Sequence, residues 1–127
     1  MPLIPHEIPE IPFAKLGAHL LDHAGKPYLV IVDYLSLWIE IKREKDKSAR
    51  SVIDAIKDVA TTHGYPEEIV ADNTPFNSAE CRKFAEEHDF VINNTSPRYP
   101  KANGLAEKGV NIAKNILKKA QEEGRDY

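Results

Sequence analysis

Two carboxylates are placed where the sequence could bring them together. Asp72 closes the short apolar segment Glu68–Ala71, and Glu107 lies one turn inside a long amphipathic segment near the C-terminus. A carboxylate at a strand end and another at a helix start can converge over one edge of a sheet. Two or three such oxygens suit Mg²⁺, and a pair of such ions can clamp the attacking and leaving oxygens of a phosphodiester. The positions of Asp72 and Glu107 therefore indicate a candidate site for a divalent cation.

His19 is the odd residue of the apolar stretch that opens the chain, two residues after Gly17. A neutral imidazole can bind metals, but it favours Zn²⁺, Cu²⁺ or Ni²⁺ over Mg²⁺. Asp22 lies three residues further along the chain, and in a regular strand its side chain would point to the opposite face unless a bulge re-aims it. Asp33 lies on the next predicted strand and is the other carboxylate near enough to consider.

Apolar periodicity predicts the elements that carry these residues. Three short segments read as strands joined by turns, and the middle one is apolar almost throughout, which is typical of a strand buried on both faces. The third alternates and is expected near an edge. Later segments change to a helical period. The predicted strands are Phe13–Leu21, Tyr28–Tyr34, Leu37–Lys42, Glu68–Ala71 and Phe90–Asn94, and the predicted helices are Ser48–His63, Asn77–His88 and a long helix from Ala102 onward.

Local signals mark where two of these helices begin. Asp46 or Ser48 can cap the first helix, and Gly64 closes it. Asn77 followed by Glu80 fits the spacing of a capping box for the second helix. The turn between the first two strands is expected over Asp22–Pro27.

The order β-β-β-α-β-α-β-α predicts an α/β fold with a mixed five-stranded sheet flanked by helices. Three strands run antiparallel and two are added through helical crossovers, as in ribonuclease-H-like domains. The chain of 127 residues suits a single domain over residues 13–127. Four prolines in residues 1–12 predict an extended lead-in.

Composition narrows the class of partner. The formal net charge of -3 counts against strong unaided binding to DNA, although a local basic patch remains compatible with it. The single cysteine, Cys81, cannot form an internal disulfide, which favours a reducing compartment. Cys81 itself is expected to be a small buried side chain. No apolar run reaches membrane-spanning length, so no membrane partner is expected.

At this point the sequence resembles the catalytic core of retroviral-type integrases, in particular those of Ty3/gypsy retrotransposons. The most specific match is the last one below, since this family carries a similar S-P-x-Y-P-x-x-N-G-x-A-E run. The matching segments are Pro5–Gly17 (PHEIPEIPFAKLG), Tyr28–Glu40 (YLVIVDYLSLWIE), His63–Asn73 (HGYPEEIVADN), Ser78–Ala85 (SAECRKFA) and Ser96–Lys108 (SPRYPKANGLAEK).

The resemblance implies a D,D,E triad that binds Mg²⁺ or Mn²⁺. Its second Asp corresponds to Asp72 and its Glu to Glu107, while His19 occupies the position of the first Asp. The family motif D-N-G-P-Q-F has become D-N-T-P-F here, with threonine in place of glycine and one residue missing. A site of His19, Asp72 and Glu107 carries one negative charge fewer than the family site, so we expect weak Mg²⁺ binding and no two-metal arrangement.

Several interpretations of these residues stay open. His19 is either a lost active-site position, with its ring satisfied by a neighbouring carboxylate, or a working metal ligand. Residues of the last helix and the loop before it could contact nucleic acid or form a solvated face, and the acidic total favours the solvated face. Leu37 and Trp38 could form an exposed contact patch, although packing into the core is the commoner outcome. The candidate nucleic-acid contacts are Lys101, Asn103, Lys108 and Lys114.

The function expected from the resemblance is therefore that of a retrotransposon integrase core that has lost catalysis and serves protein interaction or dimerisation. A residual metal-dependent nuclease or polynucleotidyl transferase is the first alternative, and non-catalytic nucleic-acid binding is the second. We expect no cofactor, with Mg²⁺ or Mn²⁺ required if activity is retained. The resemblance also implies a homodimer formed through the core, an additional protein partner, and an intracellular, nuclear location. The family's last helical segment would lie beyond Tyr127.

Overall fold

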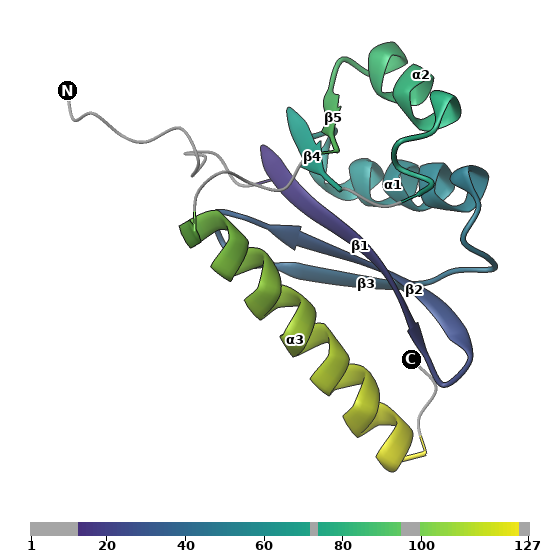
Figure 1. Ribbon diagram of the computed structural model, residues 1–127, viewed down its shortest axis with the longest axis vertical. Coiled ribbons are helices and arrows are strands. Elements are labelled where there is room, and N and C mark those ends of the chain that lie inside the picture. Colours follow the sequence, from purple (N-terminus) through teal and green to yellow (C-terminus); the bar gives the residue numbers. More distant parts are fainter. Residues whose placement is uncertain (1–12, 72–73, 95–99, 125–127) are drawn as a thin grey trace.

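The computed structural model describes residues 13–71, 74–94 and 100–124, and for residues 100–106 it describes the backbone alone. The lead-in predicted for residues 1–12 lies outside the described residues. Eight elements follow the predicted order β-β-β-α-β-α-β-α (Figure 1). The strands are β1 Lys15–His23, β2 Lys26–Asp33, β3 Ile39–Arg43, β4 Glu68–Val70 and β5 Val91–Asn93, and the helices are α1 Ala49–His63, α2 Ala79–Glu87 and α3 Pro100–Glu122.

The five strands form one mixed sheet in the order β3-β2-β1-β4-β5. β1, β2 and β3 are antiparallel neighbours, and β4 and β5 are added in parallel on the other side of β1. This confirms the predicted sheet, with β2 buried along most of its length and β3 at an edge.

The β1–β2 hairpin is tighter than predicted. The strands stay paired as far as His23 and Lys26, so the turn consists of Ala24 and Gly25 rather than Asp22–Pro27. Both residues have positive φ, 53° and 76°, which suits a two-residue turn whose twist matches that of the strands. A prediction from polar and proline residues overestimated this turn, because exposed polar residues continue the ladder here.

Helix caps explain where α1 and α2 begin. The Ser48 side chain accepts a hydrogen bond from the Ser51 amide, and the Asp46 carboxylate accepts one from the Ser48 amide, which confirms the predicted start of α1. For α2 the predicted cap is wrong by one residue. Ser78, not Asn77, caps the helix, and its hydroxyl accepts a hydrogen bond from the Cys81 amide.

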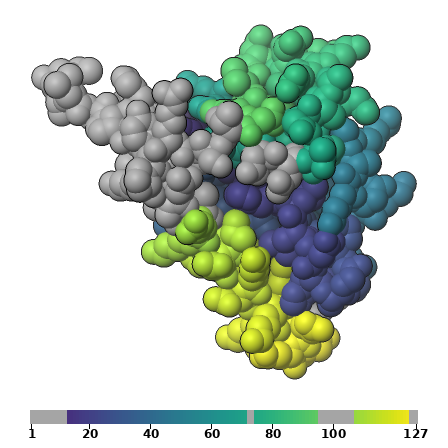
Figure 2. Space-filling view, viewed as in Figure 1, coloured from purple at the N-terminus to yellow at the C-terminus, as the bar shows by residue number. Residues whose placement is uncertain are grey.

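Helices cover both faces of the sheet. On one face α1 and α2 pack over Leu16, Leu29 and Ile31, in the largest cluster of buried apolar side chains. On the other face α3 crosses β1, β2 and β3, and its Ala113 packs against Val30 and Val32 (Figure 1). In Figure 2 the C-terminal half of α3 lies beside the β1–β2 hairpin at the lower end of the molecule. Within the described ranges no helix is both long and apolar enough to cross a membrane.

Candidate active site

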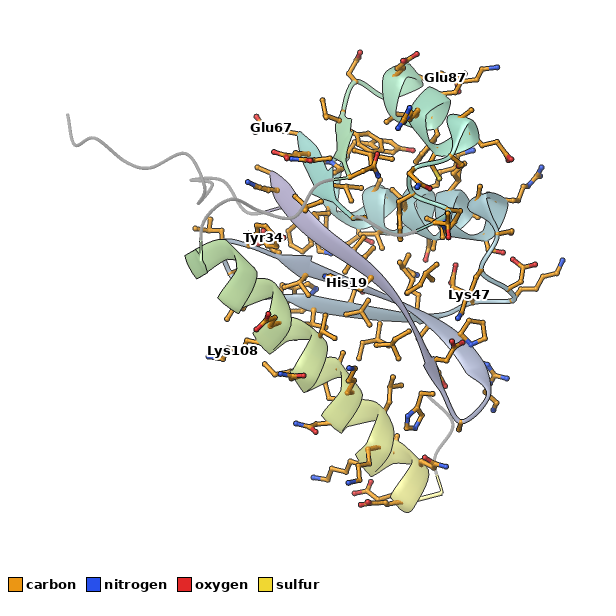
Figure 3. All side chains as sticks on the ribbon, in the orientation of Figure 1. His19, Tyr34, Lys47, Glu67, Glu87 and Lys108 are labelled. Atoms are coloured by element: carbon orange, nitrogen blue, oxygen red, sulfur yellow. The ribbon has the colours of Figure 1, made fainter. Side chains whose placement is uncertain are left out.

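His19 lies on the face of β1 that α3 covers. It is paired with Val30 of β2, and Val30 belongs to the same cluster as Ala113 of α3. Directly opposed residues on neighbouring strands share a face, so the imidazole shares the α3 side of the sheet with Val30. The side chain is half-buried (Figure 3). The sequence placed His19 correctly in the first strand, and its metal-binding role stays a prediction.

Tyr34 lies next to this position on the same face. A β-carbon built on Gly17 would lie 2.9 Å from Tyr34 Cε1, so glycine is what allows the ring to lie across β1 toward Val70 of β4. Burial, together with the charge of Glu68, raises the pKa of Tyr34 to about 12. The phenol therefore stays protonated at neutral pH and can donate a hydrogen bond. Sequence reasoning missed this residue, because its partners come from β1 and β4.

A polar group continues this face toward β5. Lys15 Nζ lies 4.0 Å from Glu68 Oε1, and Asn93 Nδ2 donates a 3.0 Å hydrogen bond to Glu68 Oε2. The Lys15 ammonium also lies 5.7 Å from the centre of the Tyr34 ring. This part of the face thus combines the buried pair Tyr34 and Val70 with a polar group, whereas the face under α1 is an apolar cluster.

The segment that leads to Asp72 is fixed from both sides. The Ala71 amide donates to the Asn93 carbonyl at 3.0 Å, and Asn94 Nδ2 donates to the Ala71 carbonyl at 2.9 Å. Asp72 itself lies outside the described residues, so its predicted role is not tested. Ala71 is buried, which makes it the last described anchor before the candidate ligand.

The N-terminal part of α3 is pressed against β2 at Gly109. A β-carbon at this residue would lie 2.6 Å from Val32 Cγ2, closer than side-chain contacts allow. This contact brings the helix close to the sheet on the same side as His19. Glu107, two residues earlier, is exposed, as are Lys108 and Lys114; Figure 3 shows Lys108 projecting from α3. The side chains of Lys101 and Asn103 lie outside the described set.

His19 therefore lies on the face of β1 that α3 covers, and Glu107 is an exposed residue of α3, two positions before the Gly109 contact with the sheet. Among residues 13–71, 74–94 and 100–124, which do not include Asp72, no group of three His, Cys, Asp or Glu side chains could hold a metal ion. A mixed imidazole and carboxylate set suits Mn²⁺ or Zn²⁺ better than Mg²⁺.

The other two carboxylates near His19 have structural roles. Asp22 points away, as predicted, and pairs with Lys47. Asp33 is fully buried, and its carboxylate accepts hydrogen bonds from the amides of Phe13, Leu35 and Ser36 and from the Ser36 hydroxyl. Asp33 thus anchors the β2–β3 connection, and its oxygens are already occupied by these donors.

Trp38 corrects an expectation of burial. Its side chain is 53% exposed, its Nε1 donates to Glu40 Oε1 at 2.9 Å, and its ring meets the His63 ring edge-on at 6.5 Å. The polar partner on the neighbouring surface keeps the indole out of the core. Leu37 does pack, half-buried, against the cluster beneath α3. Cys81 is fully buried, as predicted, and burial raises the pKa of its thiol.

Sequence comparisons reveal distant relatives, although no family model matches the chain. It is 31% identical over 126 residues to the uncharacterized protein K02A2.6 of Caenorhabditis elegans, which covers 98% of this chain and 10% of that protein. It is 28% identical over 121 residues to the Gag-Pol polyprotein of Walleye dermal sarcoma virus, covering 91% of this chain and 7% of the polyprotein. The chain thus spans a tenth or less of the length of these relatives and is related to retroelements.

Structure comparisons identify the fold. The catalytic core domain of BIV integrase matches with a TM-score of 0.79 and 16% identity, over 87% of this chain and 73% of that one. A chain of the simian T-cell lymphotropic virus intasome, in complex with PP2A regulatory subunit B56 gamma, matches with a TM-score of 0.76 and 20% identity, over 91% of this chain and 44% of that one. The HTLV-2 integrase catalytic core domain in complex with magnesium, in its trimeric form, matches with a TM-score of 0.71 and 22% identity, over 90% of this chain and 75% of that one. The predicted ribonuclease-H-like, integrase-core fold is confirmed.

Proposed function

We propose that this integrase-type core does not catalyse DNA strand transfer and serves instead as a protein-interaction and dimerisation module. His19 carries the proposal. It lies on the α3 side of β1, at the position where the family resemblance calls for the first carboxylate, while Glu107 is an exposed residue of α3 itself. A bound pair of divalent cations would supply the nucleophile activation and charge neutralisation that phosphoryl transfer needs. A site with one carboxylate fewer holds such ions more weakly.

Ancestry in the Ty3/gypsy branch is part of this proposal. It rests on the N-G-L-A-E run that ends in Glu107 and on the similarity to a protein named Gag-Pol polyprotein. The missing residue after Asp72 supports loss of catalysis, because it shortens the segment next to the candidate ligand. The structures of the HTLV-2 core are described as dimeric and trimeric forms, which supports self-association as a property to test here. A nuclear location follows from the same ancestry.

Metal titration monitored by amide NMR tests the proposal. We would add Mg²⁺, Mn²⁺ or Zn²⁺ to the wild type, to His19→Asp and to Glu107→Gln, and follow amides flanking Asp72 and Glu107. The proposal expects no site-specific response to millimolar Mg²⁺ in the wild type and a response in His19→Asp. Glu107→Gln is the matched control, since it removes the other carboxylate without adding a charge. Saturable Mg²⁺ or Mn²⁺ binding by the wild type, with DNA nicking that Glu107→Gln abolishes, would establish the nuclease instead.

Non-catalytic nucleic-acid binding has its own observation and test. Lys108 and Lys114 are exposed on α3, on the side of the sheet that carries His19. A DNA interface made by these lysines would give an affinity that falls steeply with salt concentration and with each Lys→Ala substitution. Affinity that is insensitive to Lys108→Ala and Lys114→Ala leaves the helix as a solvated face.

A further inference from the structure

The outer edge of β3 presents backbone groups in a defined pattern. The Asp33 amide donates to the Trp38 carbonyl, and the Glu44 amide donates to the Pro27 carbonyl, each at 2.9 Å. Residues of an antiparallel strand alternate between neighbours, so Trp38, Glu40, Lys42 and Glu44 direct their amides and carbonyls toward β2. Ile39 and Ile41 direct theirs outward. In the part of the chain that the structure describes, no strand pairs with this edge.

We propose that two copies of this chain join through this edge, with β3 pairing antiparallel to β3 about a two-fold axis at Ile41. This gives a continuous ten-stranded sheet, since each copy contributes five strands. The inference rests on the proposed function in one respect: it names the partner and the surface of the dimerisation module. A two-fold axis requires a self-complementary surface, so the sequence of β3 must pair favourably with itself read backwards.

The charges of β3 meet that requirement. With Ile41 opposite the partner subunit's Ile41, Glu40 lies opposite the partner subunit's Lys42, and Lys42 opposite the partner subunit's Glu40. These residues form the closely spaced positions of an antiparallel ladder, where Cα atoms approach to about 4.5 Å. Opposite charges there are favourable, and two such pairs arise from one register.

Neighbouring registers are less favourable. An axis between two residues would oppose outward-directed groups to groups already bonded to β2, and an axis at Glu40 or at Lys42 would put two glutamates or two lysines against each other. An axis at Arg43 would put two arginines against each other, and an axis at Ile39 would leave Lys42 opposite the neutral Ser36. Only the Ile41 register combines an apolar centre with two pairs of opposite charge. Register is thus specified by the side chains of the strand itself.

Burial on both faces of β3 supports the same surface. Ile39 and Ile41 are half-buried against the cluster beneath α3 and keep part of their apolar area exposed on this edge strand. Trp38, at the start of the edge, is 53% exposed. Lys42 is the charged residue that would discourage edge pairing in a monomer, and Asp58 of α1 already holds it. Partner pairing removes this apolar area from water while the Lys42 ammonium stays between two carboxylates.

Reversing the charges of Glu40 and Lys42 in separate variants, and then mixing the variants, tests the interface. A misfolded variant would not recover the dimer on mixing. Glu40→Lys alone and Lys42→Glu alone each put like charges opposite one another in a homodimer, so we expect the dimer dissociation constant to rise at least about tenfold. An equimolar mixture restores both opposite pairs in a heterodimer, and sedimentation should show the dimer recovered. A wild type that is monomeric at millimolar concentration, or single variants that dimerise as tightly as the wild type, would overturn the proposal.

Hydrogen exchange provides a second readout that needs no variant. The amides of Ile39 and Ile41 should exchange quickly in dilute protein and slowly in concentrated protein, while the Glu40 and Lys42 amides, directed toward β2, stay protected throughout. Ile41→Pro removes one outward amide and none that β2 uses, so it should abolish the dimer, while the loss of the Ile41 side chain from the cluster beneath α3 lowers the urea midpoint of the monomer as well. Concentration-independent exchange at Ile39 and Ile41 would refute edge pairing.

This result is separable from the failure of the proposed function. If charge reversal abolishes the dimer but the protein binds Mg²⁺ and nicks DNA, the β3 interface is supported and the proposed loss of catalysis is refuted. If the protein is catalytically inactive and the β3 variants still dimerise, the proposed loss of catalysis is supported and the β3 interface is refuted.

Discussion

The two faces of the central sheet are built on different principles. Under α1 and α2, large side chains such as Leu29, Ile56 and Phe84 interdigitate in one continuous cluster. Under α3, the closest contacts are made through small residues, with Gly109 against Val32 and Ala113 against Val30 and Val32, and Leu117 is the large side chain that this helix buries. Beyond the reach of α3, the same face carries the polar group of Lys15, Glu68 and Asn93.

The α1 face supplies most of the stability of the fold, and the α3 face carries the candidate site residues. An interior of large apolar side chains supplies most of the burial that holds the strands in place. On the α3 face a helix lies close to the sheet, and the same face carries His19, half-buried in the middle of β1, and the buried Tyr34. A change on the first face should therefore act on the whole fold, and a change on the second should act on the placement of α3.

Two neighbouring residues of β2 compare these faces directly. Leu29 and Val30 are both fully buried, but Leu29 faces α1 and Val30 faces α3. Leu29→Ala should lower the free energy of unfolding by about 3 to 4 kcal/mol, because it opens a cavity in the dense cluster. Val30→Ala removes fewer atoms and should cost about 2 kcal/mol. Urea unfolding measures both, and a Val30→Ala cost that exceeds that of Leu29→Ala would contradict the division.

Asp33 links the strands to the connection that carries Trp38. Replacing it by alanine leaves the amides of Phe13, Leu35 and Ser36 without their acceptor in a partly buried place. We expect Asp33→Ala to cost about 2 to 3 kcal/mol, since unsatisfied buried donors carry the penalty. Asp33→Asn keeps one acceptor oxygen and should cost about half as much. Unfolding curves and exchange rates of these three amides give the answer, and equal costs for both variants would mean that charge, not hydrogen bonding, matters.

The sequence predicted most of the α1 side and less of the α3 side. The apolar stripe of α1 and the continuous apolar run of β2 are periodic over many residues, so their elements and burial were confirmed. Their partners are other apolar residues, and any large apolar side chain gives the same signal. The resemblance also identified which residues to examine, because Asp72 and Glu107 lie in short motifs.

Contacts between distant single residues were beyond such reasoning. Nothing local to Tyr34 says that it lies over Gly17, and nothing local to Asp33 says that the Phe13 amide will reach it. The exposure of Trp38 depends on Glu40 and on His63, at the far end of α1. The cap of α2 failed for a smaller reason: Asn77 and Ser78 are both good caps, and only the backbone shows which one accepts the Cys81 amide.

The close approach of α3 should be sensitive to a single methyl group. Gly109→Ala places a carbon 2.6 Å from Val32 Cγ2, so α3 must shift or Val32 must move. We expect a cost of about 1 to 2 kcal/mol and altered amide shifts near His19, because overpacking displaces the helix. Val32→Ala provides the space, so the double variant should be more stable than the sum of the two single costs predicts. Strict additivity would show that the contact is not tight.

Two carboxyls of the β3–α1 connection should titrate on opposite sides of their usual range. Burial, outweighing the opposing charge of Lys42 and aided by Asp46 and Asp54, raises the pKa of Glu44 from 4.5 to about 7. Hydrogen bonds from Ser48 and Ser51 lower the pKa of Asp46 from 3.8 to about 2. Carbon-detected NMR of the two side chains should resolve both shifts, with Glu44→Gln removing only the upper titration.

The sign of the effect on stability follows from the Glu44 shift. The folded protein holds this proton more tightly than the unfolded chain, so the contribution is complete below about pH 4.5 and is lost as the pH rises through about 7. Because the carboxyl is partly exposed, solvent screening should keep the change below about 1 kcal/mol. The free energy of unfolding of the wild type minus that of Glu44→Gln, measured by urea unfolding at the two ends of this range, should therefore fall with rising pH. A difference that grows with pH would mean that Lys42, rather than burial, dominates the surroundings of Glu44.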